Sequence, residues 1–478
     1  MYQRNLRKNL TFADEWFIMY LVIFMLISFS VNNFLSFYDT QELSMEAGKY
    51  RNNSNRLKKY GKHKLLKFLS IYGANASGKS NLVTALGFFQ SIVVESFRTG
   101  SYPLYCRVNE ENKEKTSLFE VKLLLDGKIF VYGFKSVLSK SIFTEEWLYE
   151  ELQNGSRRSI FTRDIQNSAF LLGEYITSSK HIERLKIYGE DIKSDETVLF
   201  LKLMNQNKSS LYDKSSKLDV FKRVFSWIKY DLDVNSPENP ITNYSILNDS
   251  ESIEEITKKL SDFSTGIVKF EIVPVTEDKI SANIPNDMIK EIQQRLLDQK
   301  NQNPEIPDTF KPAVLIRMPE RHNMYIIELN NELQFEFKTM SFKHENSEAT
   351  FALSDESDGT VRLLDIIEVL LKSNENRTYV IDEINRKFHP LLTLKFIEEF
   401  LMMAEKRNVQ LIVTTHESQL MDLKLLRRDE ISFVNKDNQG YSSIYSLDSY
   451  DVRFDKKIVT EYLKGHYNAV PNWVNNKE

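Results

Sequence analysis

Residues 70–83, Ser-Ile-Tyr-Gly-Ala-Asn-Ala-Ser-Gly-Lys-Ser-Asn-Leu-Val, are the stretch that decides the fold. Within them, Gly73 to Ser80 matches G-x-x-x-x-G-K-[ST], the pattern of a loop that wraps phosphate groups. An apolar segment at 67–72 predicts a strand before the loop, and an apolar-faced helix is expected from Ser80 to about Val94. Strand, loop and helix in this order are the context that the pattern requires, so we expect a nucleotide phosphate site.

Each residue type in the loop has a chemical reason. Gly73 and Gly78 permit a tight turn that exposes backbone N–H groups, and the helix that follows adds its positive N-terminal dipole. Lys79 would place its charge on the β- and γ-phosphates, and the Ser80 hydroxyl would ligate Mg²⁺. The residues expected to bind ATP are Gly73, Asn75, Gly78, Lys79, Ser80 and Asn81.

Two later strands would supply the groups that hydrolysis needs. Residues 377–381 are β-prone and end in Asp382 and Glu383. Asp382 would hold Mg²⁺, and Glu383 would act as the general base on the attacking water. The strand at 409–415 ends in His416, which we expect beside the γ-phosphate because the carboxyl ends of parallel strands meet at one edge. A lone histidine at a strand end is otherwise more often structural.

A polar segment at 353–360, Leu-Ser-Asp-Glu-Ser-Asp-Gly-Thr, precedes a helical run at 361–371. Ser357 and the N–H groups of Gly359 and Thr360 would face an anion at the helix start. The simpler interpretation is an ordinary N-cap. The position of the segment just before the acidic strand favours the anion site.

Composition sets limits on the class of protein. The chain has 478 residues, which suggests about three domains. Apolar residues at 41% and charged residues at 27% exclude a mainly disordered chain and a protein with many membrane spans. The net charge of −4 means that any nucleic-acid contact must come from a local patch. The single cysteine, Cys106, excludes a disulfide framework and favours a cytoplasmic location.

Two segments near the N-terminus have more than one interpretation. Residues 16–29 are apolar and uncharged and follow Arg4, Arg7 and Lys8, as in a signal peptide or a short membrane anchor, which is the alternative interpretation; they are shorter than the roughly 20 residues of a membrane span. We expect a buried strand at 26–34 after an extension at 1–24, which would be an over-long start if translation begins at Met25. Residues 51–67 carry seven lysines or arginines and no acid; a solvated loop is favoured, and a nucleic-acid backbone contact is the alternative.

Local patterns place further elements along the chain. Hairpins are expected at 118–134 around Asp126-Gly127 and at 324–337 around Asn330-Asn331. Helical stripes are expected at 253–263, 289–296 and 391–406. The fold class expected is α/β, with four segments: an extension at 1–24, an N-terminal ATPase lobe with β-hairpins at 25–200, a mostly helical insertion at 201–320 and a C-terminal lobe at 321–478.

The order of these motifs resembles the ATP-binding cassette type of ATPase head. Residues 356–360 look like a variant of the family's signature, although they depart from the usual Leu-Ser-Gly-Gly-Gln. The resemblance implies that the signature binds the γ-phosphate held by a second subunit, so that a homodimer or higher oligomer encloses ATP. The signature residues are Ser357, Asp358, Gly359 and Thr360. His389 falls where the family's subunits touch.

The family's glutamine loop has no clear counterpart in the sequence. Gln90 lies too close to the phosphate loop in the sequence, and no local pattern identifies Gln153 or Gln166 as the loop residue.

Four segments, at 25–37, 70–82, 380–392 and 414–431, together with the tail at 462–471, are similar to the RecF/OLD-like AAA family ATPases of bacterial abortive-infection and anti-phage systems. The similarity covers residues 25–94 and 345–472, and it is weak in the residues between them. OLD-like proteins often carry a TOPRIM nuclease domain, but the 62 residues after His416 contain no recognisable metal set for one. The resemblance therefore implies a separate TOPRIM- or RloB-like nuclease or effector partner.

The function expected is an ATPase that regulates such an effector in phage defence. The alternative is a RecF- or SMC-like DNA-repair clamp, which the basic run at 51–67 would permit. A transporter's ATPase subunit is disfavoured, because the chain has one short apolar run and no membrane association is expected.

Overall fold

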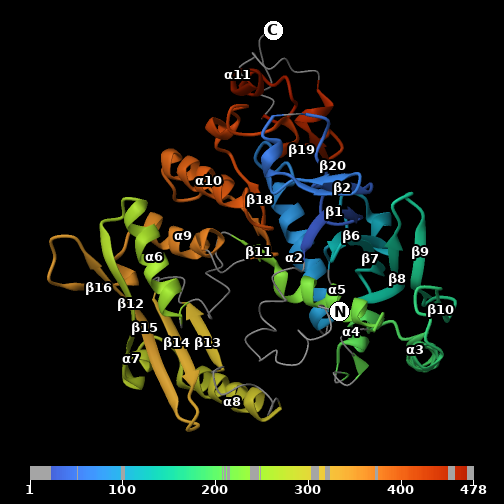
Figure 1. The fold of residues 1–478 in the computed structure, drawn as a ribbon, viewed down its shortest axis with the longest axis horizontal. Helices are drawn as coiled ribbons and strands as arrows, with labels where there is room; N and C mark the ends of the chain where they lie inside the picture. Colours follow the sequence, from blue (N-terminus) through green and yellow to red (C-terminus); the bar gives the residue numbers. More distant parts are fainter. Residues whose placement is uncertain are drawn as a thin grey trace, which may run out of the picture. The chain divides into compact units, whose positions relative to one another are not determined.

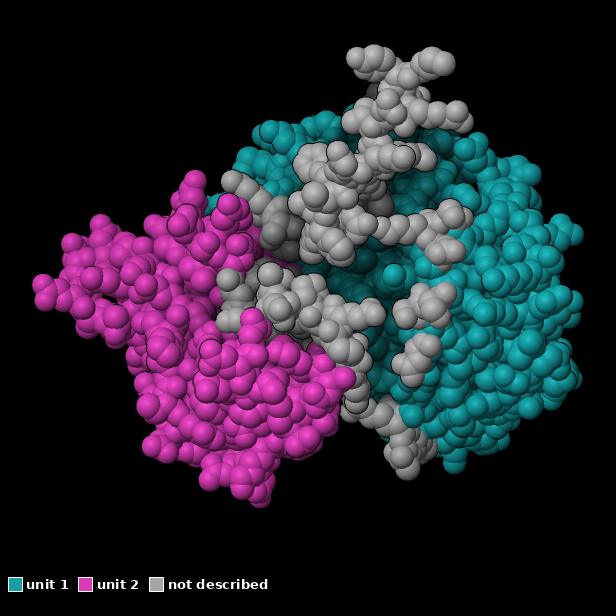
Figure 2. All heavy atoms as spheres, turned by 60° about the horizontal axis from the view of Figure 1, so that its bottom comes forward, with its two compact units in different colours: residues 1–236, 375–384, 394–478 teal, residues 237–374, 385–393 magenta. Residues whose placement is uncertain are grey.

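The computed structural model describes residues 23–50, 52–97, 103–206, 208, 211–212, 216–236, 247, 249–302, 312–317, 323–371, 375–450 and 458–470. The chain divides into two compact units, which Figure 2 colours teal and magenta. Unit 1 contains residues 1–236, 375–384 and 394–478, and unit 2 contains residues 237–374 and 385–393. The extension expected at 1–24 lies outside the described residues as far as residue 22.

A six-stranded sheet in unit 1 brings distant parts of the chain together (Figure 1). In sheet order its strands are β11 (Leu232–Asn235), β17 (Thr378–Ile381), β18 (Gln410–Thr414), β5 (Phe68–Tyr72), β19 (Ile431–Lys436) and β20 (Ser442–Ser446). The first five are parallel, and β20 is antiparallel to β19. Every residue of β5, β17 and β18 is buried, as in parallel sheets covered on both faces. The carboxyl ends of these strands therefore share one edge.

Unit 1 also contains a seven-stranded antiparallel sheet (Figure 1). Its order is β10 (Ala169–Leu172), β9 (Arg157–Asp164), β8 (Ile142–Glu151), β7 (Lys128–Val137), β6 (Ser117–Leu125), β1 (Phe24–Asn32) and β2 (Gln41–Ser44). Helix α2 (Lys79–Glu95) packs on this sheet through Phe89, which meets Phe29 edge-on at 5.9 Å between ring centroids and stacks on Phe134 at the same distance. These contacts anchor the helix that follows the phosphate loop.

The remaining helices near these sheets are α3 (Ser179–Ile192), α4 (Phe200–Met204), α5 (Asp219–Ser226), α10 (Pro390–Ala404) and α11 (Ile458–Leu463). Within the described residues, no helix has the length and apolar character needed to cross a bilayer. The apolar residues at 24–29 belong to the buried strand β1, close to the strand expected at 26–34.

Unit 2 combines helices with an antiparallel sheet (Figure 1). The sheet order is β12 (Ile267–Pro274), β15 (Phe335–His344), β14 (Met324–Leu329) and β13 (Ala313–Arg317), and β16 (Thr350–Ala352) also pairs with β15. The helices are α6 (Ser250–Asp262), α7 (Glu277–Ser281), α8 (Asn286–Gln302) and α9 (Asp358–Ile366). The expected stripe of Ile289, Ile292 and Leu296 on α8 is buried against the sheet.

The division of the chain differs from the boundaries expected at 201 and 320. Residues 201–236 lie in unit 1, because β11 pairs in parallel with the acidic strand β17. Unit 2 continues to residue 374, because β12 pairs with β15 about 70 residues later in the chain. Two strands that pair across about 70 residues cannot be recognised as partners from a local sequence pattern. The insertion was therefore expected to be mostly helical, without this sheet.

The hairpin expected at 118–134 is confirmed, and the second one forms with a longer turn. Strand β15 begins at Phe335 rather than at Glu332. The side chain of Asn330 accepts backbone hydrogen bonds from Glu332 at 3.0 Å and from Gln334 at 2.9 Å. This asparagine-centred turn holds the intervening residues out of the strand.

The basic run at 51–67 contains a hairpin rather than a solvated loop. Its strands are β3 (Lys58–Tyr60) and β4 (His63–Leu65). Arg56 is buried, donating to Leu425 O at 2.7 Å and lying 3.5 Å from a Glu430 carboxylate oxygen. Lys67 is also buried and donates to Ala404 O at 2.5 Å. The buried partners of both cations come from more than 300 residues later, so a charge count could not reveal them.

Candidate nucleotide site

The phosphate loop between β5 and α2 is packed too tightly for side chains at its two glycines. A Cβ atom on Gly73 would lie 2.3 Å from Val434 O, and one on Gly78 would lie 2.4 Å from Ser442 Oγ. Gly78 also has a φ of 115°, which L-residues rarely adopt. Glycine is therefore required at both positions.

A chain of hydroxyl and amide groups from three distant segments braces the loop. Asn81 Nδ2 donates to Ser36 Oγ at 2.7 Å, Ser36 Oγ lies 2.7 Å from Ser442 Oγ, and Ser442 Oγ donates to Ser77 O at 2.6 Å. Each hydroxyl has one proton, so Ser36 must donate to Ser442. We call Ser36, Ser77, Asn81 and Ser442 the serine brace. The Asn81 side chain, expected to bind nucleotide, is engaged in this brace.

Lys79 carries a buried positive charge beside the loop. Its side chain is only 6% exposed, and Nζ donates to Gly73 O at 2.9 Å and to Ala74 O at 3.0 Å. Burial lowers the pKa of Lys79, while the charges of Asp382 and Glu383 act to raise it. In the described part of the chain, its hydrogen-bond partners are these neutral carbonyl oxygens. A buried ammonium with no bonded anion fits a place where phosphate oxygens would bind.

The two acidic residues after β17 are held by one threonine of the neighbouring strand. Thr414 Oγ1 donates a short hydrogen bond to Asp382 Oδ1 and accepts one from the Glu383 N–H at 2.8 Å. Asp382 is buried, and Glu383 has a φ of 48° in the left-handed region. This backbone is uncommon for a residue other than glycine and is concentrated at functional sites.

His416 lies just beyond β18 and faces the same cavity as the loop. Burial is the main cause that lowers the pKa of His416, the Lys79 charge lowers it further, and Glu383 and Asp382 oppose the shift. The lowered pKa favours the neutral imidazole. In this form one ring nitrogen can donate a hydrogen bond and the other can accept one.

A cavity of about 460 Å³ joins these groups. It is lined by Asn75, Ala76, Ser77, Gly78, Lys79, Ser80, Asn81, Glu383, His416 and Lys436. Ser80 is exposed, and the buried Asp382 directly precedes the cavity-lining Glu383 in the chain. The donor set combines a hydroxyl and a carboxylate, which suit Mg²⁺, with backbone N–H groups and a lysine, which suit phosphate. The residues therefore fit Mg²⁺ and a nucleoside triphosphate.

Sequence reasoning missed four residues of this region. Ser36 and Ser442 belong to the brace, and Lys436 lines the cavity from the end of β19. Asn235 is buried at the carboxyl end of β11, where its carbonyl accepts the Asp382 N–H at 3.0 Å. No local motif marks any of them, because they come next to the loop only through the strand order.

The three glutamines considered for a glutamine loop lie elsewhere. Gln90 donates to Ile228 O at 2.8 Å and to Leu232 O at 2.6 Å, within the fold. Gln153 and Gln166 are exposed in the turns that follow β8 and β9. At the carboxyl end of the acidic strand, the residue paired with Ile381 is Asn235.

The signature-like segment lies in unit 2, where it begins helix α9. Ser357 caps the helix by accepting the Thr360 N–H at 3.2 Å, as the N-cap interpretation predicted. Asp358 forms an ion pair with Lys387 at 2.8 Å, and a Cβ on Gly359 would lie 3.3 Å from Lys387 O. The exposed ring of His389 accepts the Leu391 N–H at the start of α10. The segment is thus preorganised as a helix N-terminus.

Comparisons with known proteins give one family and several solved structures. A family model described as "AAA domain, putative AbiEii toxin, Type IV TA system" matches residues 68–422. No curated protein matches the chain.

Three solved structures illustrate the similarity. An SMC head domain from Thermotoga maritima is 15% identical, with a TM-score of 0.32, covering 88% of this chain and 98% of that chain. An Smc head domain with an extended coiled coil, bound to the C-terminal domain of ScpA from Pyrococcus furiosus, is 16% identical, with a TM-score of 0.36 and coverage of 92% and 100%. An SmcHead bound to the C-winged helix domain of ScpA is 15% identical, with a TM-score of 0.35 and coverage of 88% and 97%.

Proposed function

The chain belongs to the AAA domain family whose model spans residues 68–422, and from this premise we propose that it is an ATPase that binds and hydrolyses Mg²⁺–ATP. Its fold is α/β, with a P-loop ATPase head of the ABC type. The observation that supports the proposal is that β5, β17 and β18 are neighbours in the sheet and that one cavity is lined by the phosphate loop, Glu383 and His416.

The role of each group follows from its position. The loop N–H groups and Lys79 would hold the β- and γ-phosphates, and Ser80 and Asp382 would hold Mg²⁺. Bound Mg²⁺ would neutralise charge on the phosphates during transfer. Glu383 would accept a proton from the attacking water, and neutral His416 would hydrogen-bond the γ-phosphate.

Two substitutions test hydrolysis separately from binding. Glu383→Gln keeps the size of the side chain and removes its basicity, so it should bind ATP and hydrolyse it at least about 100-fold more slowly. Lys79→Ala should lose ATP binding itself. Glu398→Gln, an exposed glutamate on α10, is the matched control and should leave turnover unchanged. Wild-type turnover in the Glu383→Gln variant would remove that residue from the proposed base role.

We further propose that two copies enclose ATP, with Ser357 of one copy acting on nucleotide held by the other. The preorganised N-terminus of α9 supports this assignment, since helix N-termini bind anions. Ser357→Arg and Lys79→Ala should each abolish turnover alone. An equimolar mixture should recover activity, because one of its composite sites contains neither substitution. Ser354→Arg, at an exposed position three residues earlier, is the control. No recovery on mixing would contradict action between subunits.

The biological role proposed is that of a cytoplasmic sensor or regulatory subunit in abortive infection, controlling a separate nuclease-like effector. The family description, which names a putative AbiEii toxin of a Type IV toxin–antitoxin system, supports this direction. Affinity purification of the Glu383→Gln variant from infected cells should recover a TOPRIM- or RloB-like protein. Phage protection that persists in the Lys79→Ala variant would contradict an ATP-dependent role.

A DNA-repair clamp is the second candidate, and one observation favours it. Exposed Lys59 and Lys64 lie directly opposite each other across the β3–β4 hairpin, which is costly unless an anion lies between them. Double-stranded DNA should then stimulate ATP turnover, and Lys59→Gln with Lys64→Gln should remove the stimulation. A rate of ATP turnover that does not change when DNA is added would exclude this candidate.

A further inference from the structure

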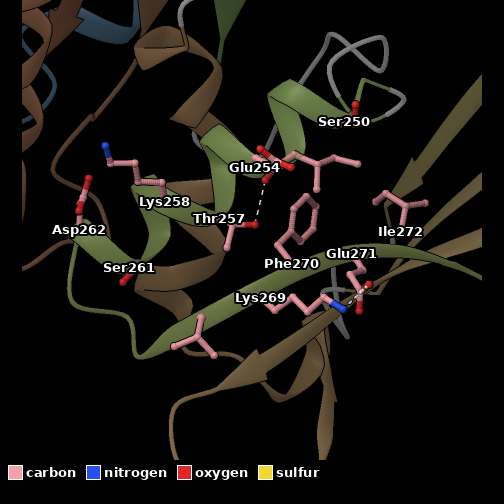
Figure 3. Close-up of a pocket in the computed structure, with 12 residues that line it drawn as sticks. Ser250, Glu254, Thr257, Lys258, Ser261, Asp262, Lys269, Phe270, Glu271 and Ile272 are labelled. Atoms are coloured by element: carbon pink, nitrogen blue, oxygen red, sulfur yellow. Dashed lines mark hydrogen bonds and ion pairs between the residues drawn. The ribbon is translucent and has the colours of Figure 1, made fainter.

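A groove of about 640 Å³ runs between helix α6 and strand β12 in unit 2 (Figure 3). One side is a helical stripe at every third or fourth position, formed by Ser250, Ile253, Glu254, Thr257, Lys258, Ser261 and Asp262. The other side is formed by five consecutive strand residues, Val268, Lys269, Phe270, Glu271 and Ile272. We call this the α6–β12 groove.

The groove runs along the edge of the sheet. Successive strand residues point to opposite faces, so a groove lined by consecutive residues adjoins the strand edge. Among the described strands, β12 is the last in its sheet and pairs only with β15. A β-bulge at Val268 and a proline at 274 are both typical of edge strands.

One hydrogen bond shows which backbone groups of β12 point toward β15. The Val275 N–H donates to Phe337 O at 2.8 Å, so after the bulge the odd-numbered residues Lys269, Glu271 and Val273 direct their backbone groups toward β15. The N–H and C=O groups of Phe270 and Ile272 therefore point away from the sheet, toward the groove. No described residue pairs with them, so they can pair with another strand.

We propose that this edge pairs with the same edge of a second copy of the chain. The sequence Val268-Lys269-Phe270-Glu271-Ile272 is self-complementary in an antiparallel pair centred on Phe270. Each Lys269 then faces Glu271 of the other copy, and each Val268 faces Ile272. Phe270 would pair with its counterpart through two backbone hydrogen bonds, which is the phase that the ladder requires.

The charges on this edge favour the same register. Lys269 lies opposite Lys343 of β15, so two like charges are neighbours within one copy. Lys269 also reaches Glu271 along its own strand at 2.7 Å, although both side chains remain about half exposed (Figure 3). A second Glu271 brought opposite Lys269 would balance the surplus positive charge.

Helix α6 carries a second pair of opposite charges at the same distance along the groove. With about 1.5 Å per helical residue and about 3.3 Å per strand residue, Ile256 and Phe270 both lie roughly 9–10 Å from the turn that joins the two elements. A two-fold axis through Phe270 thus passes the helix near Ile256, where it brings Glu254 opposite Lys258 of the second copy. The pairing would also cover Val268, which is 46% exposed.

Cysteine cross-linking tests the register in the full chain without nucleotide. Lys269 and Glu271 of two copies would form a non-hydrogen-bonded pair with Cα atoms about 4.5 Å apart, which a disulfide can bridge. A tagged Lys269→Cys chain mixed with an untagged Glu271→Cys chain should form a mixed disulfide dimer under mild oxidation. Either variant alone should form it at least about tenfold less, because neither residue faces itself. Equal cross-linking in all three samples, or none in the mixture, would overturn the proposal.

Exchanging the charges of Lys269 and Glu271 tests the same pairing without introducing a disulfide. Lys269→Glu should weaken nucleotide-free self-association at least about tenfold in analytical ultracentrifugation. The double variant Lys269→Glu with Glu271→Lys should restore it, because the exchanged pairs are complementary again. Lys279→Glu on α7 is the control with the same change of charge at an exposed position outside the groove. A wild-type chain that stays monomeric, or a double variant as weak as the single one, would refute the interface.

This association differs from the ATP-dependent dimer proposed above and can fail independently of it. The experiments are repeated in a Lys79→Ala background, which removes nucleotide binding and leaves unit 2 unchanged. Self-association that persists there supports the α6–β12 groove as its source. Self-association that disappears there would assign the dimer to ATP and reject the edge pairing.

Discussion

Replacing Ser442 by alanine removes one oxygen atom and tests whether the serine brace controls nucleotide affinity. The substitution removes the hydrogen bond to Ser77 O at 2.6 Å and the acceptor of the Ser36 hydroxyl. Ser442 is buried, so water cannot replace either bond without opening the loop. A lost buried hydrogen bond with a stranded partner costs about 1–3 kcal/mol.

This loss of free energy destabilises the loop conformation that binds phosphate. If about 1–2 kcal/mol is lost from it, ATP affinity should fall about 5- to 30-fold. The kcat should stay within about twofold of the wild type, because the hydrogen bonds that Ser442 forms within the described residues go to Ser36 and Ser77 and not to the acidic pair. Ser443→Ala, at the exposed neighbouring position, is the matched control.

The assay is titration calorimetry with ATP, performed on the Glu383→Gln variant so that hydrolysis does not interfere. Thermal unfolding of the same proteins measures the loss of stability separately. An ATP Kd within twofold of the Ser443→Ala control, together with a lower Tm, would show that the brace stabilises the fold without tuning the site. That result would refute the reasoning.

Three further outcomes are expected. Gly78→Ala should bind ATP at least about tenfold more weakly in a filter-binding assay, because its Cβ would lie 2.4 Å from Ser442 Oγ at a φ of 115°. Thr414→Val should lower kcat about 10- to 100-fold in steady-state assays over a range of Mg²⁺, because both acidic residues lose a shared partner; an unchanged kcat would contradict this. Lys67 has a pKa lowered by burial to about 8, so the folded chain binds fewer protons than the unfolded chain above that pH. Stability contributed by this group should therefore rise between pH 8 and pH 10.5, and Lys67→Met should remove that part of the slope in denaturant titrations.

The elements that carry the site could be predicted where a local pattern is dense. The loop at 73–80 lies between a strand and a helix, as expected, because each neighbouring segment is apolar with its own period. The strands before Asp382 and His416 were also expected, since parallel strands are short, buried and rich in β-branched residues. The expectation that they share one sheet edge rested on the rule that the carboxyl ends of parallel strands meet there.

What could not be predicted depends on long-range pairing. Ser36 and Ser442 reach the loop from 406 residues apart, and no spacing rule connects two single serines. In the sheet of unit 2, the β14–β15 hairpin was expected, but β12 was missed because it looks like any short amphipathic segment until β15 pairs with it. The basic run misled for a related reason, since Arg56 and Lys67 look solvated in sequence but are buried in the fold.

The strand order of the six-stranded sheet has a consequence for synthesis of the chain. Strand β5, which carries the phosphate loop, has β18 and β19 as its two neighbours, and both come from residues 410–436. A ribosome translating from the N-terminus therefore exposes the loop long before the strands that flank it exist. The loop can gain both of its flanking strands only after residues 410–436 have emerged. A chain that stops before residue 410 therefore lacks the two strands that pair with β5.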